Sequence, residues 1–288
     1  MKAAPFGYAA PRSLDEAIEH LGRYGDDAKV LAGGQSLVPV LAMRLSRFEQ
    51  LVDLQHVPGL TGVSRSNGTV RVAAMTTHTD VGRSPEAAAV PLLTRATPFI
   101  GHDAIRNRGT LGGAVAHADP AAEWPAVALA LDAELEATGP GGTRTIPAAE
   151  FFLGTWTTAL EPTEVLVAAH FPVWDGACGF AVEEASRRHG DFAMAGVVCG
   201  VQVDGGRVTR AALAFLGVGG TPVRASAAEA ALVGTAVADV EAAELGALAA
   251  DGLRPPDDLH ASGAQRQRMS RVLAQRALTT AIEEATGA

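Results

Sequence analysis

Cysteine is nearly absent from this chain of 288 residues, which contains only Cys178 and Cys199 and no C-x-x-C motif. Two cysteines cannot build a disulfide framework. They also cannot supply the four ligands that an iron–sulfur cluster held by cysteine alone requires. We expect both to be free thiols in a reducing compartment, which indicates a cytoplasmic protein.

Long hydrophobic runs and an excess of positive charge are also missing. No run of about 18 apolar residues predicts a membrane span, and residues 1–6 lack the apolar core of a signal peptide. Lys and Arg number 23 against 32 Asp and Glu, a net charge of −9. This acidic balance argues against nucleic acid as a main partner. It does not exclude an anionic ligand, because backbone amides can hold one.

The common catalytic and metal-binding patterns are absent as well. The chain has no Gly-x-Ser-x-Gly motif, and nothing in it groups a nucleophile with a base. His78, His102, His117 and His189 do not form a metal-ligand spacing. The sequence therefore predicts no catalytic side chain and no metal site.

Two glycine-pair loops are the most informative feature that is present. The first is Ala32-Gly33-Gly34-Gln35-Ser36-Leu37, and the second is Arg106-Asn107-Arg108-Gly109-Thr110-Leu111-Gly112-Gly113-Ala114. Adjacent glycines allow positive φ and leave no Cβ to block a ligand, and successive amides in such a turn form an anion site. Two such sites suggest a diphosphate and hence a dinucleotide, although neither loop is the G-x-G-x-x-G of a Rossmann unit.

Each loop also has a simpler interpretation, since glycine pairs often only turn the chain. Arg106 and Arg108 could balance phosphate charge or lie in solvent. Asp119 and Glu123 follow the second loop, and their carboxylates could accept hydrogen bonds from ribose or ribityl hydroxyls. Spacing alone supports equally a helix N-cap at Asp119 and an acid in the first helical turn at Glu123.

Hydrophobic periodicity predicts alternating helices and strands in the first 174 residues. Ser13 and Glu16 form a capping box for a helix that starts at Leu14. Asn67-Gly68 predicts a hairpin turn, and Thr77 or Thr79 would cap the helix that follows. The other predicted segments are strands at 29–32, 51–54, 70–75, 133–138 and 165–172 and helices at 39–45, 91–100 and 124–131.

The composition changes at Trp174-Asp175-Gly176. Beyond it, residues 195–203 and 207–217 form paired strands around Asp204-Gly205-Gly206. By spacing alone, residues 187–193 form a turn between two elements. From Ser226 onward the alanine-rich sequence predicts helices, interrupted at Pro255-Pro256.

Four segments together resemble the FAD subunit of molybdenum hydroxylases, the medium subunit of the carbon monoxide dehydrogenase and xanthine dehydrogenase family. The resemblance extends over essentially the whole chain, and residues 106–119 look especially like aromatic N-heterocycle hydroxylases such as quinoline 2-oxidoreductase. The segments are Ala32–Pro39, Ala74-Met75-Thr76-Thr77-His78, Thr110-Leu111-Gly112-Gly113 and Arg187–Ala193.

The resemblance implies an α+β fold: a two-lobed FAD-binding domain of the vanillyl-alcohol oxidase (PCMH) type and a small α/β C-terminal domain. Its expected boundaries are residues 1–57, 58–174 and 175–288. It implies FAD contacts along the glycine loops and at four further positions. Carried over by position, they are Ala32, Gly33, Gly34, Gln35, Ser36, Ile100, Thr110, Leu111, Gly112, Gly113, Ala114, Asp119, Glu123 and Phe192.

The implied role is electron transfer within a larger enzyme. Gln35 stands where some relatives have histidine, so we expect non-covalent FAD. Molybdopterin and [2Fe–2S] clusters are expected only in a large and a small partner subunit, as a dimer of heterotrimers. An alternative is a stand-alone FAD-dependent oxidoreductase of the same fold. A third hypothesis is a non-catalytic nucleotide-binding or assembly protein.

Overall fold

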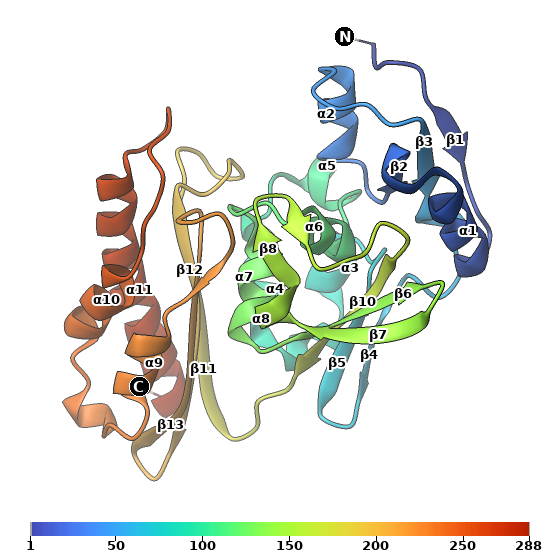
Figure 1. The fold of residues 1–288 in the computed structure, drawn as a ribbon. Helices are drawn as coiled ribbons and strands as arrows, with labels where there is room; N and C mark the ends of the chain where they lie inside the picture. Colours follow the sequence, from blue (N-terminus) through green and yellow to red (C-terminus); the bar gives the residue numbers. More distant parts are fainter. Residues whose placement is uncertain (1, 288) are drawn as a thin grey trace.

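Three main sheets follow one another along residues 2–287, the part of the chain that the computed structural model describes (Figure 1). The first is a small parallel sheet with strand order β1-β3-β2. Ser13 caps α1 by accepting from the Glu16 amide, as predicted, while the Glu16 carboxylate reaches back to the Arg12 amide. The elements are β1 (Gly7–Ala9), α1 (Leu14–Tyr24), η1 (Gly25–Asp27), β2 (Ala28–Leu31), α2 (Leu37–Ala42), β3 (Gln50–Asp53) and η2 (Leu54–His56).

The helix predicted at 39–45 starts and ends earlier than expected. Arg44 has φ of 59°, and the Leu45 amide donates to the Val40 carbonyl while the Arg44 amide donates to Leu41. This is a Schellman-type ending with a left-handed residue after the last turn. The apolar periodicity runs through this turn, which is why it suggested a longer helix.

The second sheet is antiparallel, with strand order β4-β5-β10-β6-β7. Asn67 and Gly68 both have positive φ, as the predicted hairpin requires. Thr77, rather than Thr79, caps α3. The strands are β4 (Val63–Ser66), β5 (Thr69–Ala73), β6 (Glu134–Gly139), β7 (Gly142–Pro147) and β10 (Val165–Pro172), with a separate hairpin of β8 (Phe152–Gly154) and β9 (Thr157–Thr158).

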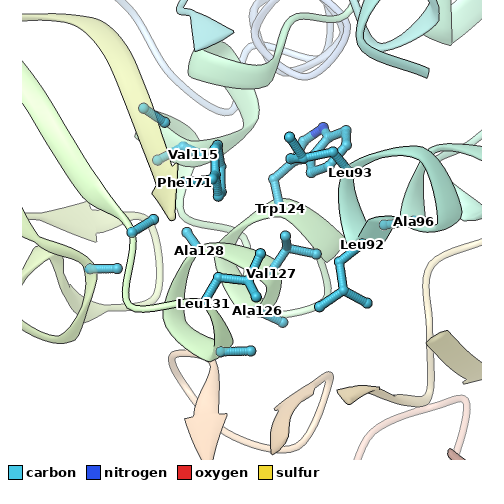
Figure 2. Packing of buried hydrophobic residues seen from close by; sticks show 14 of the residues in the cluster. Leu92, Leu93, Ala96, Val115, Trp124, Ala126, Val127, Ala128, Leu131 and Phe171 are labelled. Atoms are coloured by element: carbon cyan, nitrogen blue, oxygen red, sulfur yellow. The ribbon is translucent and has the colours of Figure 1, made fainter. Parts of the chain in front are cut away.

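Helix α7 lies at the centre of this part. It is apolar on all sides, and Leu92, Leu93, Val115 and Phe171 lie around it in the buried cluster (Figure 2). A helix without a polar face is stable only when it is covered all round. The helices here are α3 (His78–Arg83), η3 (Ala87–Ala89), α4 (Pro91–Ala96), η4 (Thr97–Phe99), α5 (Asp103–Arg106), α6 (Leu111–His117), α7 (Glu123–Ala130) and α8 (Ala148–Phe151).

The C-terminal sheet is antiparallel and has the order β11-β12-β13-β14. β11 was not predicted, because its sequence holds a single β-branched residue, Val182; nine residue pairs with β12 define it. The elements are β11 (Ala177–Ala185), β12 (Ala195–Asp204), β13 (Arg207–Leu216), β14 (Val223–Arg224), α9 (Ser226–Leu232), η5 (Val237–Asp239), α10 (Ala242–Asp251) and α11 (Gly263–Thr286).

Both faces of this sheet are buried, so β12 and β13 are apolar almost throughout. Ala214 and Leu216 belong to the same cluster as α7, whereas Leu213 and Phe215 pack with the C-terminal helices. Successive side chains of a strand point to opposite faces. The sheet is therefore held between the helices of the second part and α9–α11.

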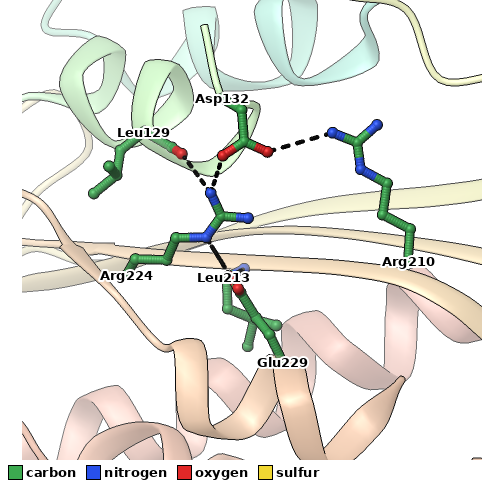
Figure 3. A network of polar contacts seen from close by, with 6 residues as sticks. All are labelled: Leu129, Asp132, Arg210, Leu213, Arg224 and Glu229. Atoms are coloured by element: carbon green, nitrogen blue, oxygen red, sulfur yellow. Dashed lines mark hydrogen bonds and ion pairs between the residues drawn. The ribbon is translucent and has the colours of Figure 1, made fainter. Parts of the chain in front are cut away.

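A polar network also crosses this boundary (Figure 3). The guanidinium of Arg224, on β14, contacts Asp132 and donates to the Leu129 carbonyl at 3.3 Å. Its Nε donates to Glu229 at 2.9 Å, and Arg210 lies 3.4 Å from Asp132. The end of α7 is thus tied to the C-terminal sheet by charge as well as by apolar packing.

Candidate functional site

The two glycine loops pack directly against each other. A Cβ built on Gly33 would lie 2.1 Å from the carbonyl oxygen of Arg108 and 2.7 Å from the Cα of Gly109. A Cβ built on Gly113 would lie 3.1 Å from that of Ala32. The two loops, 76 residues apart between Gly33 and Gly109, therefore form one structure at the junction of the first and second parts.

The structure explains the glycines at positions 33 and 112 differently from the sequence. The sequence suggested open space for a ligand, but a Cβ at Gly33 or Gly112 would strike protein backbone, at Arg108 and at Ala74 respectively. Gly112 lies within α6; among the glycines of these two loops only Gly34 has positive φ, at 74°. Glycine is needed at 33 and 112 for close chain packing, and at 34 for the turn.

The backbone amides of the two loops differ in availability. Within residues 2–287, no protein acceptor lies within hydrogen-bond distance of the amides of Gly33, Gly34, Gln35 or Ser36. The amides at 111–114 are all used, donating to the carbonyls of Thr76, Ala74 and Thr110 and to the Thr110 hydroxyl. The first loop therefore has a row of free donors of the kind that an anion needs, whereas the amides at 111–114 are occupied within the protein.

The imidazole of His78 packs against Gly109 of the second loop. A Cβ on Gly109 would lie 2.6 Å from its Nε2, and its Nδ1 accepts from the indole N–H of Trp124 at 2.9 Å. Burial, with a smaller effect of Arg106, lowers the pKa of His78 to about 4. His78 is therefore neutral at pH 7 and serves as an acceptor for a buried donor, not as a charged ligand.

Ile100 and Phe192, far apart in sequence, lie on neighbouring loops. Gly190 has φ of 85° and its Cβ would lie 2.5 Å from the ring of His102, so the 187–193 turn rests on the loop after Ile100. The Ile100 side chain is buried, and its carbonyl accepts from Arg106 at 3.0 Å. Phe192 is 71% exposed. Of the two side chains, only that of Phe192 projects into solvent.

Asp119 lies just before α7, and Glu123 is its first residue and lies near Glu184 of the C-terminal sheet. Asp119 accepts from the Ala121 amide at 2.9 Å within a turn; Ala122 is the N-cap of α7, so the capping interpretation of Asp119 is wrong. Glu123 is in the first turn, as the simpler interpretation expected. Burial, the nearby Glu184 and Asp119 raise the pKa of Glu123 to about 8, so its carboxyl is largely protonated at pH 7.

Two neighbours of this segment were missed by sequence reasoning. Glu184, on β11, has a buried Oε2 with no hydrogen-bond partner, and burial raises its pKa to about 7. Trp156 has φ of 57°, is 66% exposed and stacks on His117 with ring centroids 6.3 Å apart. Only tertiary pairing brings β11 and the β8–β9 hairpin here, so no local pattern marks either residue.

Residues 2–287 show neither a cluster of metal ligands nor a membrane-spanning helix. They contain no group of three or more His, Cys, Asp or Glu arranged to hold a metal ion. None of their helices is both long enough and apolar enough to cross a membrane. Cys178 and Cys199 are free thiols.

Comparison with known proteins covers almost the whole chain. Residues 4–174 match the family model described as the FAD binding domain in molybdopterin dehydrogenase, and residues 180–281 match the CO dehydrogenase flavoprotein C-terminal domain. The chain is 39% identical to the 6-hydroxypseudooxynicotine dehydrogenase complex subunit alpha of Paenarthrobacter nicotinovorans, over 99% of this chain and 97% of that protein. It is 38% identical to the carbon monoxide dehydrogenase medium chain of Hydrogenophaga pseudoflava, over 96% of both chains.

Solved structures agree with these sequence matches. Carbon monoxide dehydrogenase from Hydrogenophaga pseudoflava superposes with a TM-score of 0.94 at 40% identity, covering 98% of both chains. Quinoline 2-oxidoreductase from Pseudomonas putida 86 gives a TM-score of 0.93 at 38% identity, covering 99% of both chains. The predicted α+β fold, with its FAD-binding and C-terminal domains, is confirmed. This chain belongs to the family of FAD-binding medium subunits of molybdenum hydroxylases.

Proposed function

We propose that this protein carries FAD non-covalently, takes electrons from [2Fe–2S] clusters of a small partner subunit and passes them to an external acceptor. A large molybdopterin-binding partner would oxidise the substrate. The observation that carries the proposal is the junction of the two glycine loops, where Gly33 packs against Arg108 and the four consecutive amides of residues 33–36 donate to no acceptor within residues 2–287. A diphosphate matches that row of donors.

The residues present fit FAD. The amides of Gly33 to Ser36 would hold the diphosphate, and the neutral Glu123 could donate to a hydroxyl or carbonyl of the cofactor while Asp119 accepts. Phe192 offers an exposed ring for stacking. The proposed contacts are Ala32, Gly33, Gly34, Gln35, Ser36, Ile100, Thr110, Leu111, Gly112, Gly113, Ala114, Asp119, Glu123 and Phe192.

When bound, FAD supplies a redox group that protein side chains lack. The side chains of this subunit would bind and orient it. His78 and Glu123 are largely uncharged at pH 7, so they would add no full charge beside the cofactor. No side chain of this chain is proposed to act as acid or base on the organic substrate.

The choice of substrate belongs to a partner in this proposal. Relatives at 38–40% identity are named for carbon monoxide and for quinoline, two chemically unrelated compounds. Because a subunit of the same fold and length serves both substrates, we propose that it does not contact them. We propose a dimer of heterotrimers in the cytoplasm, where thiols such as Cys178 and Cys199 stay reduced.

We also propose the domain division 1–57, 58–174 and 175–288. Each part has its own main sheet, which supports the division. The first lobe and the second lobe would each contribute one glycine loop, and the C-terminal domain would contribute Phe192.

Purification of the native protein tests the proposal. We expect it to co-purify with two further subunits, to show flavin absorption bands and to release FAD on denaturation. A pure native protein without flavin bands would contradict the proposal. A chain that runs alone and oxidises a small substrate unaided would favour the stand-alone oxidoreductase instead.

A further inference from the structure

Arg266, in the first turns of α11, is a buried charge far from the glycine loops. It is 5% exposed. Its Nη1 donates to the carbonyls of Met194 at 2.6 Å and Gly217 at 2.9 Å, and its Nη2 donates to Asp258 at 2.5 Å. Its Nε is buried without a partner. A buried guanidinium that is not fully satisfied costs stability, and apolar residues would often fill such a site more favourably.

Asp258 fixes the guanidinium from the other side. Its Oδ1 accepts from the amides of His260 and Ala261 at 2.8 and 3.0 Å. These amides and Arg266 lower the pKa of Asp258 to about 2. Asp258 is therefore ionised at neutral pH, and its carboxylate pairs with the Arg266 guanidinium.

The two carbonyls that accept from Arg266 lie next to two segments of the proposed flavin site, residues 187–193 and 119–123. Met194 is two residues after Phe192. The amide of Gly217 donates to the carbonyl of Pro120, beside Asp119, at 2.8 Å. Gly217 has φ of 74°, and a Cβ there would lie 2.9 Å from the carbonyl of Ala193. Arg266, Gly217 and Pro120 thus form a continuous polar connection from α11 to the start of α7.

We propose that Arg266 is a positioning residue: it sets the distance between the 187–194 turn and the 119–123 segment, and so fixes how the two enclose the bound flavin. The proposal rests on the function proposed above, because it requires FAD to lie against these segments. Arg266 itself does not contact the cofactor. The planar guanidinium holds its donors in a fixed fork that spans two carbonyls and a carboxylate, whereas a lysine would present all its donors from a single nitrogen.

The test replaces Arg266 in the complex purified with its partner subunits. Arg266→Met removes the fork, and Arg268→Met is the matched control, since Arg268 is exposed on the same helix. We measure the visible circular dichroism of the bound flavin, its midpoint potential and its dissociation constant. We expect Arg266→Met to change the visible dichroism and the potential and to raise the FAD Kd about tenfold. Arg266→Lys should give an intermediate effect, and Arg268→Met none.

A purely structural role predicts a different result: a lower melting temperature with an unchanged flavin spectrum, potential and affinity, which would overturn the proposal. If the complex with Arg266→Met does not assemble, Asp258→Asn is the variant that tests the proposal. It weakens the ion pair with Arg266 and keeps the size and shape of the side chain at position 258. An altered flavin spectrum in Asp258→Asn supports the proposal, and an unaltered one refutes it. Wild-type complex without flavin would instead refute the proposed function.

Discussion

At the scale of single residues, Gly33 is constrained by the second loop. Gly33→Ala places a Cβ within 2.1 Å of the Arg108 carbonyl, so the two loops must separate. We expect a loss of stability of about 1–3 kcal/mol and a purified complex with much less FAD. The measurements are the flavin-to-protein ratio and thermal unfolding.

Gly141→Ala is the control for this substitution, because a Cβ there meets nothing within 4 Å. It should leave both quantities unchanged. Full flavin content in Gly33→Ala would contradict the assignment of the loop junction to the diphosphate.

The raised pKa of Glu123 predicts that the stability of the cofactor-free chain depends on pH. Its pKa is raised from 4.5 to about 8, so between these values the folded protein keeps a proton that the unfolded chain releases. The contribution of Glu123 to the free energy of unfolding is therefore most favourable below pH 4.5. It is lost progressively as the pH rises from 4.5 through 8. Glu123→Gln should remove this loss and be more stable than wild type at pH 8.5, by about 2–4 kcal/mol.

Denaturant unfolding across this pH range measures the effect. Glu184, with a pKa raised to about 7, adds a loss in the lower part of the same window, so Glu184→Gln should give a smaller gain. Glu150→Gln, on the exposed surface of α8, is the control. Parallel pH curves for wild type and Glu123→Gln would show that Glu123 ionises normally.

At the scale of elements, the start of α3 is joined to α7 by His78 and Trp124. His78→Phe leaves the buried indole N–H without its acceptor, which should cost about 1–3 kcal/mol. Trp124→Phe in the same background removes the orphaned donor. A double-mutant cycle of the two substitutions measures the coupling, which we expect to be stabilising. A coupling energy near zero would mean that the contact does not hold the two helices.

At the scale of the whole molecule, the Arg224 network connects the C-terminal sheet to α7 (Figure 3). Arg224→Met leaves Asp132 and Glu229 without this partner, and we expect a loss of about 1–3 kcal/mol. The apolar contacts of Ala214 and Leu216 remain, so the fold should persist with a weakened boundary. Calorimetry should then resolve two transitions where wild type shows one.

Arg271→Met, an exposed substitution on α11, is the control for Arg224→Met. It should keep the wild-type melting profile. A single transition at the wild-type temperature in Arg224→Met would show that apolar packing alone couples the parts.

Local sequence patterns were sufficient for much of the chain. Ser13, Asn67-Gly68 and Thr77 mark a helix start, a hairpin and a second helix start, because caps and turns depend on residues only a few positions apart. The strand at 165–172 and the helix around 124–131 follow from apolar runs. Combined, the glycine loops and the 187–193 segment were enough to identify the family.

Other features were decided only by tertiary structure. β11 exists through its pairing with β12, and Glu184 lies near Glu123 only because the C-terminal sheet packs against α7. The sequence also suggested an anion-binding site at each glycine loop. In the structure, the amides of the second loop donate to the carbonyls of Thr76, Ala74 and Thr110. The sequence by itself determined which backbone turns are possible and which family they belong to. Which amides stay free, and which carboxyls stay neutral, depends on neighbours that only folding brings together.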